Sequence, residues 1–396
     1  MNTDAWLDDI HAQLRDLAAR SLGRSLREVS HDGRFVTVAG RRLLNLASND
    51  YLALSQHSSL AQAVAKAAHE QGTGAGASRL VAGHTPLHAE VERRFARFKH
   101  AEAALICPTG YMANLAAVSS LAGEGDLICL DKLNHASLID AARASGATVR
   151  VYPHGDLSKL DRLLGRGDAQ KRKLIVTDSV FSMDGDTADL PALCDLADQH
   201  DAILLVDEAH GSGVLGCSGA GLAELQNVSE RVDVVVSTAS KALGSLGGII
   251  TSKAAVIDLI INRGRAFIFT TGVPPTQAAA INAALDVVRD EPWRRQRVLE
   301  LSTLLRAELL QRNWQLPPSN VPAPIVPLIT GSAESALALA AHLSERGFFA
   351  PAIRPPTVAP GAARVRLSLR ADIEPAELQS LLAALDAWHG RDDRIG

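Results

Sequence analysis

Two residues whose side chains could do chemistry together follow two apolar segments of the chain. Asp207 comes directly after residues 202–206, and Lys241 follows residues 232–236 within a few positions. Most lysines are solvated surface groups, but a lysine shielded from water loses its proton more easily and can form a Schiff base. A carboxylate at the end of a strand has two interpretations, because it can cap the following turn or pair with a buried cation.

The residues around the lysine help to decide between a functional pair and a surface lysine with a capping acid. Lys241 follows the hydroxyl-rich stretch Ser237-Thr-Ala-Ser240 and precedes Gly244. Hydroxyls and nearby backbone amides suit a phosphate group. A lysine, an acid and a phosphate-binding segment are the groups that pyridoxal 5′-phosphate (PLP) requires: the lysine bonds its aldehyde, and the acid keeps its ring nitrogen protonated. The pairing therefore predicts a PLP site, with a capping acid and a surface lysine as the alternative.

Two other motifs suggest functions that their context argues against. The glycine-rich stretch 72–78 is similar to a dinucleotide-binding loop, but that fingerprint must follow a strand and open a helix. Here the glycines follow a helical stretch, so we interpret them as a loop that allows close backbone approach. Asp207-Glu-Ala-His210 is similar to a helicase motif, yet the sequence has no GxxxxGK[ST] loop to hold the phosphates.

The composition is that of an ordinary globular protein. Of 396 residues, 47% are hydrophobic, and 40 basic against 44 acidic residues give a net charge of -4, so no nucleic-acid partner is expected. The four cysteines are widely spaced without a CxxC pair, which argues against a disulfide framework or a metal site. The N-terminus lacks the pattern of a signal peptide, and no apolar run approaches the roughly 18 residues of a membrane span. We expect a cytoplasmic protein with no membrane partner.

The order of elements predicts an α/β fold in which a mostly parallel sheet is covered by helices. Apolar runs typical of such buried strands alternate with helical stretches over the first two thirds of the chain. The runs are 103–107, 127–130, 149–152, 174–177, 203–206, 232–236 and 248–250, and the helical stretches are 58–71, 86–99, 110–121, 136–144 and 190–200. We predict an N-terminal helix and β-hairpin segment over residues 1–48, a large domain over 49–289 and a smaller C-terminal α/β domain over 290–396.

Short stretches spread along the chain occur in an order typical of one family. They are Asn49-Asp-Tyr-Leu52, Gly76-Ala-Ser-Arg-Leu80, His84-Thr-Pro-Leu-His88, Asn134-His-Ala-Ser137, Phe181-Ser-Met-Asp-Gly-Asp186, Val206-Asp-Glu-Ala-His-Gly211, Ser240-Lys-Ala-Leu-Gly244 and Thr270-Thr-Gly-Val-Pro-Pro275. In these stretches the sequence resembles the α-oxoamine synthase family of fold-type I PLP-dependent transferases. The resemblance runs from Arg24 to about Leu385 and implies an acyltransferase that joins an amino acid to an acyl thioester.

The resemblance also implies roles for individual residues at the cofactor. Lys241 would bond PLP, Asp207 would pair with its ring nitrogen, and His135 would stack on the ring. The remaining cofactor contacts that the family implies are His210 and Ser182 beside the phenolic oxygen, the backbone amides of Gly110 and Tyr111 and the hydroxyl of Thr238 at the phosphate, and Thr271 reaching the phosphate of a neighbouring subunit. The last contact implies a homodimer with its active site at the interface.

The substrate is indicated by a smaller set of residues. The stretch Ala352-Ile-Arg-Pro-Pro-Thr-Val358 and the stretch Arg364-Val-Arg-Leu367 are similar to the family members that use a pimeloyl thioester with L-alanine. The acyl carrier could be coenzyme A or acyl carrier protein. Arg366 would hold the amino acid carboxylate in a bidentate fork. The other residues that the resemblance places at the substrate are Asn49, Thr357, His135 and Arg24, with Arg20 and Arg27 as competitors of Arg24 for the distal pimeloyl carboxylate.

Two positions depart from the family pattern. Ala53 stands where the family usually has glycine, and Ala239 precedes Ser240 where larger residues are common. Neither change removes a catalytic group. Two alternatives to the pimeloyl assignment remain: a relative that uses glycine or serine with a different acyl-CoA, and a non-catalytic subunit that keeps the fold as a scaffold.

Overall fold

The structure is a computed structural model that describes residues 3–167 and 170–388. It divides into two compact units. The large unit comprises residues 49–300 and 319–323, and the small unit comprises residues 1–48, 301–318 and 324–396. The contacts thus group the N-terminal segment with the C-terminal residues, which the predicted division kept apart, and the change of unit near residue 300 falls inside the helix α12 (Trp293–Gln311).

The large unit is built on a seven-stranded sheet. Its strand order is β4-β10-β9-β8-β7-β5-β6, and all pairs are parallel except those that β10 makes with β4 and β9. The strands are β4 (Ala103–Cys107), β5 (Leu127–Asp131), β6 (Thr148–Tyr152), β7 (Lys173–Asp178), β8 (Ala202–Asp207), β9 (Val234–Thr238) and β10 (Gly248–Ser252). The prediction of a mostly parallel sheet in an α/β fold is confirmed.

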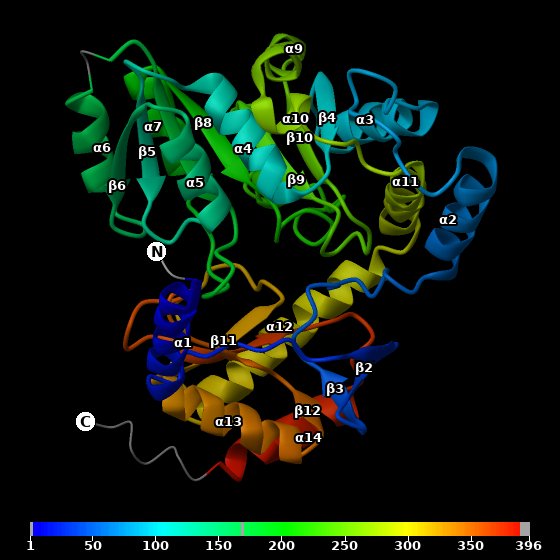
Figure 1. The fold of residues 1–396 in the computed structure, drawn as a ribbon, viewed down its shortest axis with the longest axis vertical. Coiled ribbons are helices and arrows are strands. Elements are labelled where there is room, and N and C mark those ends of the chain that lie inside the picture. Colours follow the sequence, from blue (N-terminus) through cyan, green and yellow to red (C-terminus); the bar gives the residue numbers. More distant parts are fainter. Residues whose placement is uncertain (1–2, 168–169, 389–396) are drawn as a thin grey trace. The chain divides into compact units, whose positions relative to one another are not determined.

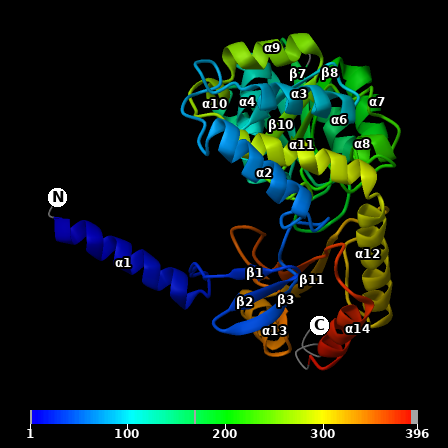
Figure 2. The ribbon, with the colours of Figure 1, turned by 90° about the vertical axis from the view of Figure 1, so that its right-hand side faces the viewer.

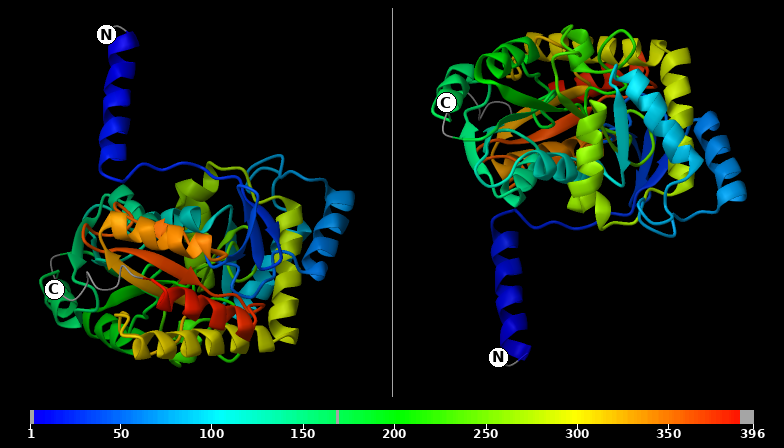
Figure 3. Two further views of the ribbon diagram at one scale, coloured as in Figure 1. Left: turned by 90° about the horizontal axis from the view of Figure 1, so that it is seen from below. Right: turned by 90° about the horizontal axis from the view of Figure 1, so that it is seen from above.

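Helices cover both faces of this sheet (Figures 1 and 3). The helices are α2 (Ser58–Gln71), α3 (Pro86–Phe98), α4 (Gly110–Leu121), α5 (Ala136–Ala144), α6 (Leu157–Gly165), α7 (Leu190–His200), α8 (Leu222–Leu225), α9 (Ala254–Arg263), α10 (Arg265–Ile268) and α11 (Pro275–Asp290). In β8, Leu205 belongs to the core that α4, α5, α9 and α10 form, while its neighbour Leu204 is also fully buried. Because successive side chains of a strand point to opposite faces, β8 is covered on both sides, which explains its uninterrupted apolar run.

The small unit contains two sheets. One has the order β1-β2-β3-β12, and the other has the order β11-β14-β13. Their strands are β1 (Ser30–Asp32), β2 (Phe35–Val38), β3 (Arg41–Asn45), β11 (Ile325–Gly331), β12 (Phe348–Phe349), β13 (Ala352–Ile353) and β14 (Ala363–Ser368), and the unit's helices are α1 (Thr3–Ala19), α13 (Ala333–Glu345) and α14 (Pro375–Asp386). Figure 2 shows α1 and these strands with the colours of the N- and C-terminal segments.

Two details of the small unit differ from or add to the sequence pattern. The predicted hairpin turns at Ala39 and Gly40, where both residues have positive φ, as a two-residue turn between twisted strands requires. The stretch 348–353 forms two short strands, β12 and β13, that pair with different neighbours. No helix in the described part of the chain is long and apolar enough to cross a membrane.

Candidate active site

The carboxyl ends of four parallel strands bring polar side chains to one edge of the large sheet. β5, β7, β8 and β9 are neighbours, and they end at Asp131, Asp178, Asp207 and Thr238. The edge outside the carboxyl ends is where open α/β sheets place their ligands. β9 ends two residues later than the apolar pattern suggested, because Ser237 and Thr238 are buried strand residues whose hydroxyls are hydrogen bonded.

Lys241 is the first residue of a hydrogen-bonded chain at this edge. Its Nζ lies 2.9 Å from Nε2 of His210, and Nδ1 of that ring lies 2.6 Å from the hydroxyl of Tyr51. The Tyr51 hydroxyl in turn donates to Oδ1 of Asn49 at 3.2 Å. Because the amide oxygen of Asn49 can only accept, the donors run in one direction, from Lys241 through His210 and Tyr51 to Asn49. This order puts the ring proton of a neutral His210 on Nδ1.

Asp207 is held at the same edge by two donors. Its Oδ2 accepts from Nδ2 of Asn114 at 2.7 Å, and its Oδ1 accepts from the backbone amide of Ala209 at 2.8 Å. The carboxylate is nearly buried, with 5% of the residue exposed. A buried carboxylate fixed in this way suits a cationic ring nitrogen, which agrees with the role that the resemblance implies for Asp207.

His135 is connected to Asp207 through two further side chains. The second proton of the Asn114 amide goes to Oγ of Ser137 at 2.8 Å, and that hydroxyl lies 2.7 Å from Nδ1 of His135. The backbone amide of Ser137 also donates to Nδ1 of His135, at 3.3 Å. Desolvation by the surrounding protein lowers the pKa of His135, although its side chain is accessible. The ring is therefore neutral near pH 7 and carries its proton on Nε2.

Asp178 secures the backbone beneath this histidine. Its Oδ2 accepts from the backbone amide of His135 at 2.8 Å, and it pairs in register with Asp207 on the adjacent strand. Burial and the neighbouring charge of Asp207 raise the pKa of Asp178 well above its usual value. Two carboxylates side by side at strand ends resist simultaneous ionisation, as is common at functional sites.

The first turn of α4 provides a place for a phosphate group. Thr109 caps this helix by accepting from the backbone amide of Met112 at 3.2 Å, and the amides of Gly110 and Tyr111 belong to the first turn. Helix N-termini favour anions because their first amides lack partners within the helix. A Cβ on Gly110 would lie 3.4 Å from Cβ of Thr238, so the missing side chain leaves room between the helix and β9.

The hydroxyls near Gly110 are arranged differently from the expectation. The Thr238 hydroxyl donates to the carbonyl of Gly247 at 3.0 Å, and its oxygen lies 2.8 Å from Oγ of Ser240. Ser240 is exposed, whereas Thr238 is buried. The hydroxyl of Ser240, to which the family resemblance gave no separate role, is therefore the more accessible of the two.

Three of the residues expected to bind substrate lie in the small unit. Arg366 is a buried residue of β14 whose Nη2 donates to Oγ of Ser368 at 3.0 Å. Arg24 donates from Nη2 to the carbonyl of Pro355 at 2.9 Å, which brings it beside the stretch that carries the exposed Thr357. Its competitor Arg20 instead pairs with Asp16 at 3.1 Å.

Two further cofactor-binding candidates, Ser182 and Thr271, lie in the large unit. Ser182 is half-buried in the turn that follows β7. Thr271 is exposed on a segment that is anchored by a hydrogen bond of 3.0 Å from the amide of Gly272 to the carbonyl of Ala77. The neighbouring Phe269 is 71% exposed.

Sequence reasoning missed Tyr51, Asn114, Ser137 and Asp178. Tyr51 and Ser137 lie within stretches that match the family, so their positions carried a signal without a role. Asn114 is one helical turn beyond Gly110 and had no sequence signal of its own. The sheet edge fits PLP. Lys241 is placed for its aldehyde, the fixed carboxylate of Asp207 for its ring nitrogen, and the N-terminus of α4 for its phosphate.

Comparison with known proteins places the chain in a family. A model of the aminotransferase class I and II family matches residues 41–385. The 8-amino-7-oxononanoate synthase of Anaeromyxobacter dehalogenans is 46% identical over 382 residues, which cover 96% of this chain and 95% of that protein. The 8-amino-7-oxononanoate synthase of Geobacter sulfurreducens is 44% identical over 379 residues, which cover 95% and 96%.

Solved structures agree with this family. Serine palmitoyltransferase from S. paucimobilis, with a bound PLP–myriocin adduct, has a TM-score of 0.91 at 28% identity and covers 98% of both chains. The 8-amino-7-oxononanoate synthase of Francisella tularensis has a TM-score of 0.75 at 27% identity, covering 87% of this chain and 96% of that one.

The fold and the site define a fold-type I PLP-dependent enzyme of the transferase class, and PLP is its cofactor. Within that class, the chain belongs to the 8-amino-7-oxononanoate synthase family.

Proposed function

We propose that this enzyme condenses L-alanine with a pimeloyl thioester and releases 8-amino-7-oxononanoate, CO₂ and the free thiol, a step of biotin biosynthesis. The observation that carries the proposal is the contact of 2.9 Å between Nζ of Lys241 and Nε2 of His210, at the sheet edge where Asp207 is fixed. The proposal is supported by the family to which the chain belongs, whose members are named for this product.

The chemistry divides between the cofactor and the chain. Bound PLP withdraws electrons from the Cα of an attached amino acid. The free amine of Lys241 takes the Cα proton, and His210 orients that amine through its Nε2. Asp207, held by Asn114, would pair with the ring nitrogen of bound PLP and favour its protonated, electron-withdrawing form. A base must lie within hydrogen-bond reach of the proton that it removes, and the contact to His210 limits where the amine of Lys241 can point.

His135 supplies a hydrogen-bond donor in the proposed reaction. Both donors at its Nδ1 come from Ser137, so the proton of the neutral ring is on Nε2. In this state Nε2 can donate to the carbonyl oxygen of the thioester, where negative charge develops as the new carbon–carbon bond forms. The lowered pKa of His135 keeps the ring in this neutral state at neutral pH.

Two arginines are suited to recognise the carboxylates of the two substrates. The guanidinium of Arg366 suits the carboxylate of alanine, and that of Arg24 suits the distal carboxylate of the pimeloyl chain, because a guanidinium can bind a carboxylate through two parallel hydrogen bonds. Thr357 belongs to the stretch that Arg24 contacts through Pro355. Asn49 ends the hydrogen-bonded chain from Lys241 and so shapes the pocket indirectly.

We also propose a homodimer in the cytoplasm. The exposed Thr271 would reach the phosphate of the neighbouring subunit, as in the family. Large apolar side chains flank this segment, since Leu80 is 52%, Val81 81% and Phe269 71% exposed. A second copy of the chain would shield this apolar surface from water.

Thiol release from pimeloyl-CoA by the PLP-loaded enzyme tests the proposal, with L-alanine, glycine and L-serine compared. Release that depends on L-alanine is the expected result. Release with glycine or serine alone would assign the chain to a related synthase with another substrate. A yellow protein that releases no thiol would be tested with pimeloyl-acyl carrier protein, and failure there would overturn the pimeloyl assignment. A colourless protein without activity would favour the scaffold alternative.

A further inference from the structure

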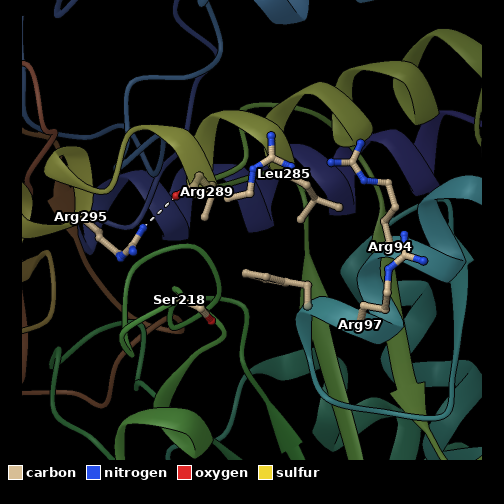
Figure 4. A pocket seen from close by; sticks show the side chains of 8 residues that line it. Arg94, Arg97, Ser218, Leu285, Arg289 and Arg295 are labelled. Atoms are coloured by element: carbon tan, nitrogen blue, oxygen red, sulfur yellow. Dashed lines mark hydrogen bonds between the residues drawn. The ribbon is translucent and has the colours of Figure 1, made fainter.

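A pocket of about 380 Å³ lies in the large unit and shares no residue with the site described above (Figure 4). Its walls come from α3, the loop before α8, the end of α11 and the start of α12. The residues that line it are Arg94, Arg97, Phe98, Ser218, Leu285, Val288, Arg289 and Arg295. A pocket of this size lies within the range of small-molecule sites, and its four guanidinium groups make it unusual.

Acidic residues balance only part of this positive charge. Arg94 pairs with Asp286 at 2.6 Å. Arg289 pairs with Asp290 at 2.7 Å and also lies 3.1 Å from Asp286. Two carboxylates therefore accompany these two arginines, and neither of them pairs with Arg97 or Arg295.

In the described part of the chain the other two arginines form no ion pair with a carboxylate, although the charge of Glu224 acts on Arg295 at longer range. Arg295 donates to two backbone carbonyls, those of Val288 at 2.8 Å and Cys217 at 2.5 Å. Burial lowers the pKa of Arg295, because a carbonyl compensates the lost hydration of a cation less well than an anion does. Within residues 3–167 and 170–388, the guanidinium of Arg97 makes no hydrogen bond or ion pair, and Figure 4 shows its side chain extending from α3 at the pocket.

The rest of the lining combines an apolar surface with one unsatisfied hydroxyl. Leu285 and Val288 are 7% and 3% exposed, and Phe98 lies beside them half-buried. Oγ of Ser218 is buried and has no hydrogen-bond partner among the described residues. Buried polar atoms are nearly always hydrogen bonded, so this hydroxyl lacks a partner that a ligand could provide.

We propose that this pocket binds a phosphate monoester with a small apolar body. Such a group carries a charge of roughly −1.5 to −2 near pH 7 and three strong acceptor oxygens. Its charge matches the two guanidiniums of Arg97 and Arg295, and its oxygens can also accept from Ser218. Its apolar body lies against the half-buried Phe98, beside Leu285 and Val288, where it removes its own apolar surface and that of Phe98 from water.

Calorimetric titration of the full-length, PLP-loaded enzyme with phenyl phosphate tests the proposal. Loading with PLP keeps the cofactor's own phosphate site filled. Saturable binding of one phenyl phosphate per chain is expected, with inorganic phosphate about tenfold weaker because it lacks the apolar body. Benzyl alcohol, which has the ring without the charge, is expected not to bind. Equal affinity for phenyl phosphate and inorganic phosphate would overturn the apolar part of the proposal.

Three variants distinguish binding of phenyl phosphate in the pocket from a general effect of the protein's positive charge. Arg97→Gln and Arg295→Gln each remove one charged donor and are expected to weaken phenyl phosphate binding about ten- to a hundredfold. Arg93→Gln removes the same charge from the same helix, but Arg93 pairs with Glu90 and does not line the pocket. That control is expected to change the affinity by less than about twofold, because Arg93 does not line the pocket and its charge acts on the ligand only through solvent that salt screens.

The proposal fails if the wild-type enzyme shows no saturable binding of phenyl phosphate. It also fails if both Arg97→Gln and Arg295→Gln bind as tightly as wild type, or if Arg93→Gln loses as much affinity as they do. Far-ultraviolet circular dichroism and the retained PLP absorbance establish that each variant is folded.

Discussion

Nζ of Lys241 and Nε2 of His210 lie 2.9 Å apart, and the other nitrogen of that histidine is fixed by the hydroxyl of Tyr51. The orientation of the lysine amine therefore depends on a tyrosine that is 190 positions away in the sequence and completely buried. Such a contact restricts both the tautomer of the histidine and the rotation of its ring.

Tyr51→Phe removes the hydroxyl that fixes His210 while keeping the aromatic ring in the core. Loss of one buried hydrogen bond that leaves its partner unpaired is expected to lower kcat about ten- to a hundredfold. Steady-state thiol release measures this change. Tyr152→Phe is the matched control, because Tyr152 is also buried in the large unit but its hydroxyl interacts with Thr177. Equal rates of Tyr51→Phe and wild type would contradict the claim that the Tyr51 hydroxyl orients His210 and Lys241.

Asn114→Ala cuts the two hydrogen bonds that join Asp207 to Ser137. The carboxylate of Asp207 then loses its Oδ2 donor, so we expect weaker PLP binding and slower exchange of the alanine α-proton, each by about tenfold. Proton exchange in deuterated water and titration of the apoenzyme with PLP measure the two effects. Asn262→Ala, at an exposed position of α9, is the control. The prediction is wrong if both variants behave alike.

Ala53→Gly tests the departure from the family pattern at this position. Ala53 has a φ of 57°, a left-handed conformation that costs a residue with a Cβ atom about 1–2 kcal/mol. Glycine avoids that cost but loses about 0.5–1 kcal/mol through the greater freedom of its unfolded chain. We expect the free energy of unfolding to rise by about 0.5–1 kcal/mol, measured by urea denaturation. Ala61→Gly, at an exposed position inside α2, should lower it, and the same sign for both variants would contradict the argument.

The contacts of His154 are expected to contribute to the free energy of unfolding in a pH-dependent way. Its Nδ1 lies 3.0 Å from Oδ1 of Asp131 and its Nε2 lies 2.7 Å from Oδ2 of Asp186. Partial burial opposes the charged ring, but the hydrogen bonds and charges of Asp131 and Asp186 outweigh it and raise the pKa of His154 to about 10. Because the folded pKa exceeds the unfolded one of 6.5, the stabilisation is complete below 6.5 and is lost as the pH rises through 10.

Urea denaturation of wild type and His154→Asn at several pH values tests this prediction. Near pH 6 the variant is expected to lose about 1–2 kcal/mol, a modest value for a charged hydrogen bond because the ring is partly exposed. By about pH 10 the difference is expected to shrink as His154 loses its proton. A difference that grows with pH would show that the neutral ring is the one stabilised.

Much of the fold could be predicted because its strands are buried on both faces. Their apolar runs, such as 103–107 and 127–130, mark β4 and β5 to within a residue. The helix α9 was not anticipated, since its sequence is almost as apolar as a strand. The end of β9 was misplaced because Ser237 and Thr238 are polar and yet buried in the strand.

The candidate site could be predicted only where strand ends determine it. Asp207 and Lys241 follow apolar runs, so their positions at one edge followed from the sequence. Asn114 and Tyr51 reach the site from a helix face and a loop far away in the chain, and only the folded backbone brings them to their partners. No spacing in a sequence encodes such pairs.

The lysine that bonds PLP can be identified directly. Reduction of the PLP-loaded enzyme with borohydride, followed by mass spectrometry of its peptides, determines which lysine carries the cofactor. We expect the added mass on Lys241, and its loss from the Lys241→Ala variant together with turnover. The adduct on another residue, such as the buried Lys99, whose Nζ contacts Ser212 at 2.7 Å, would contradict the proposed site.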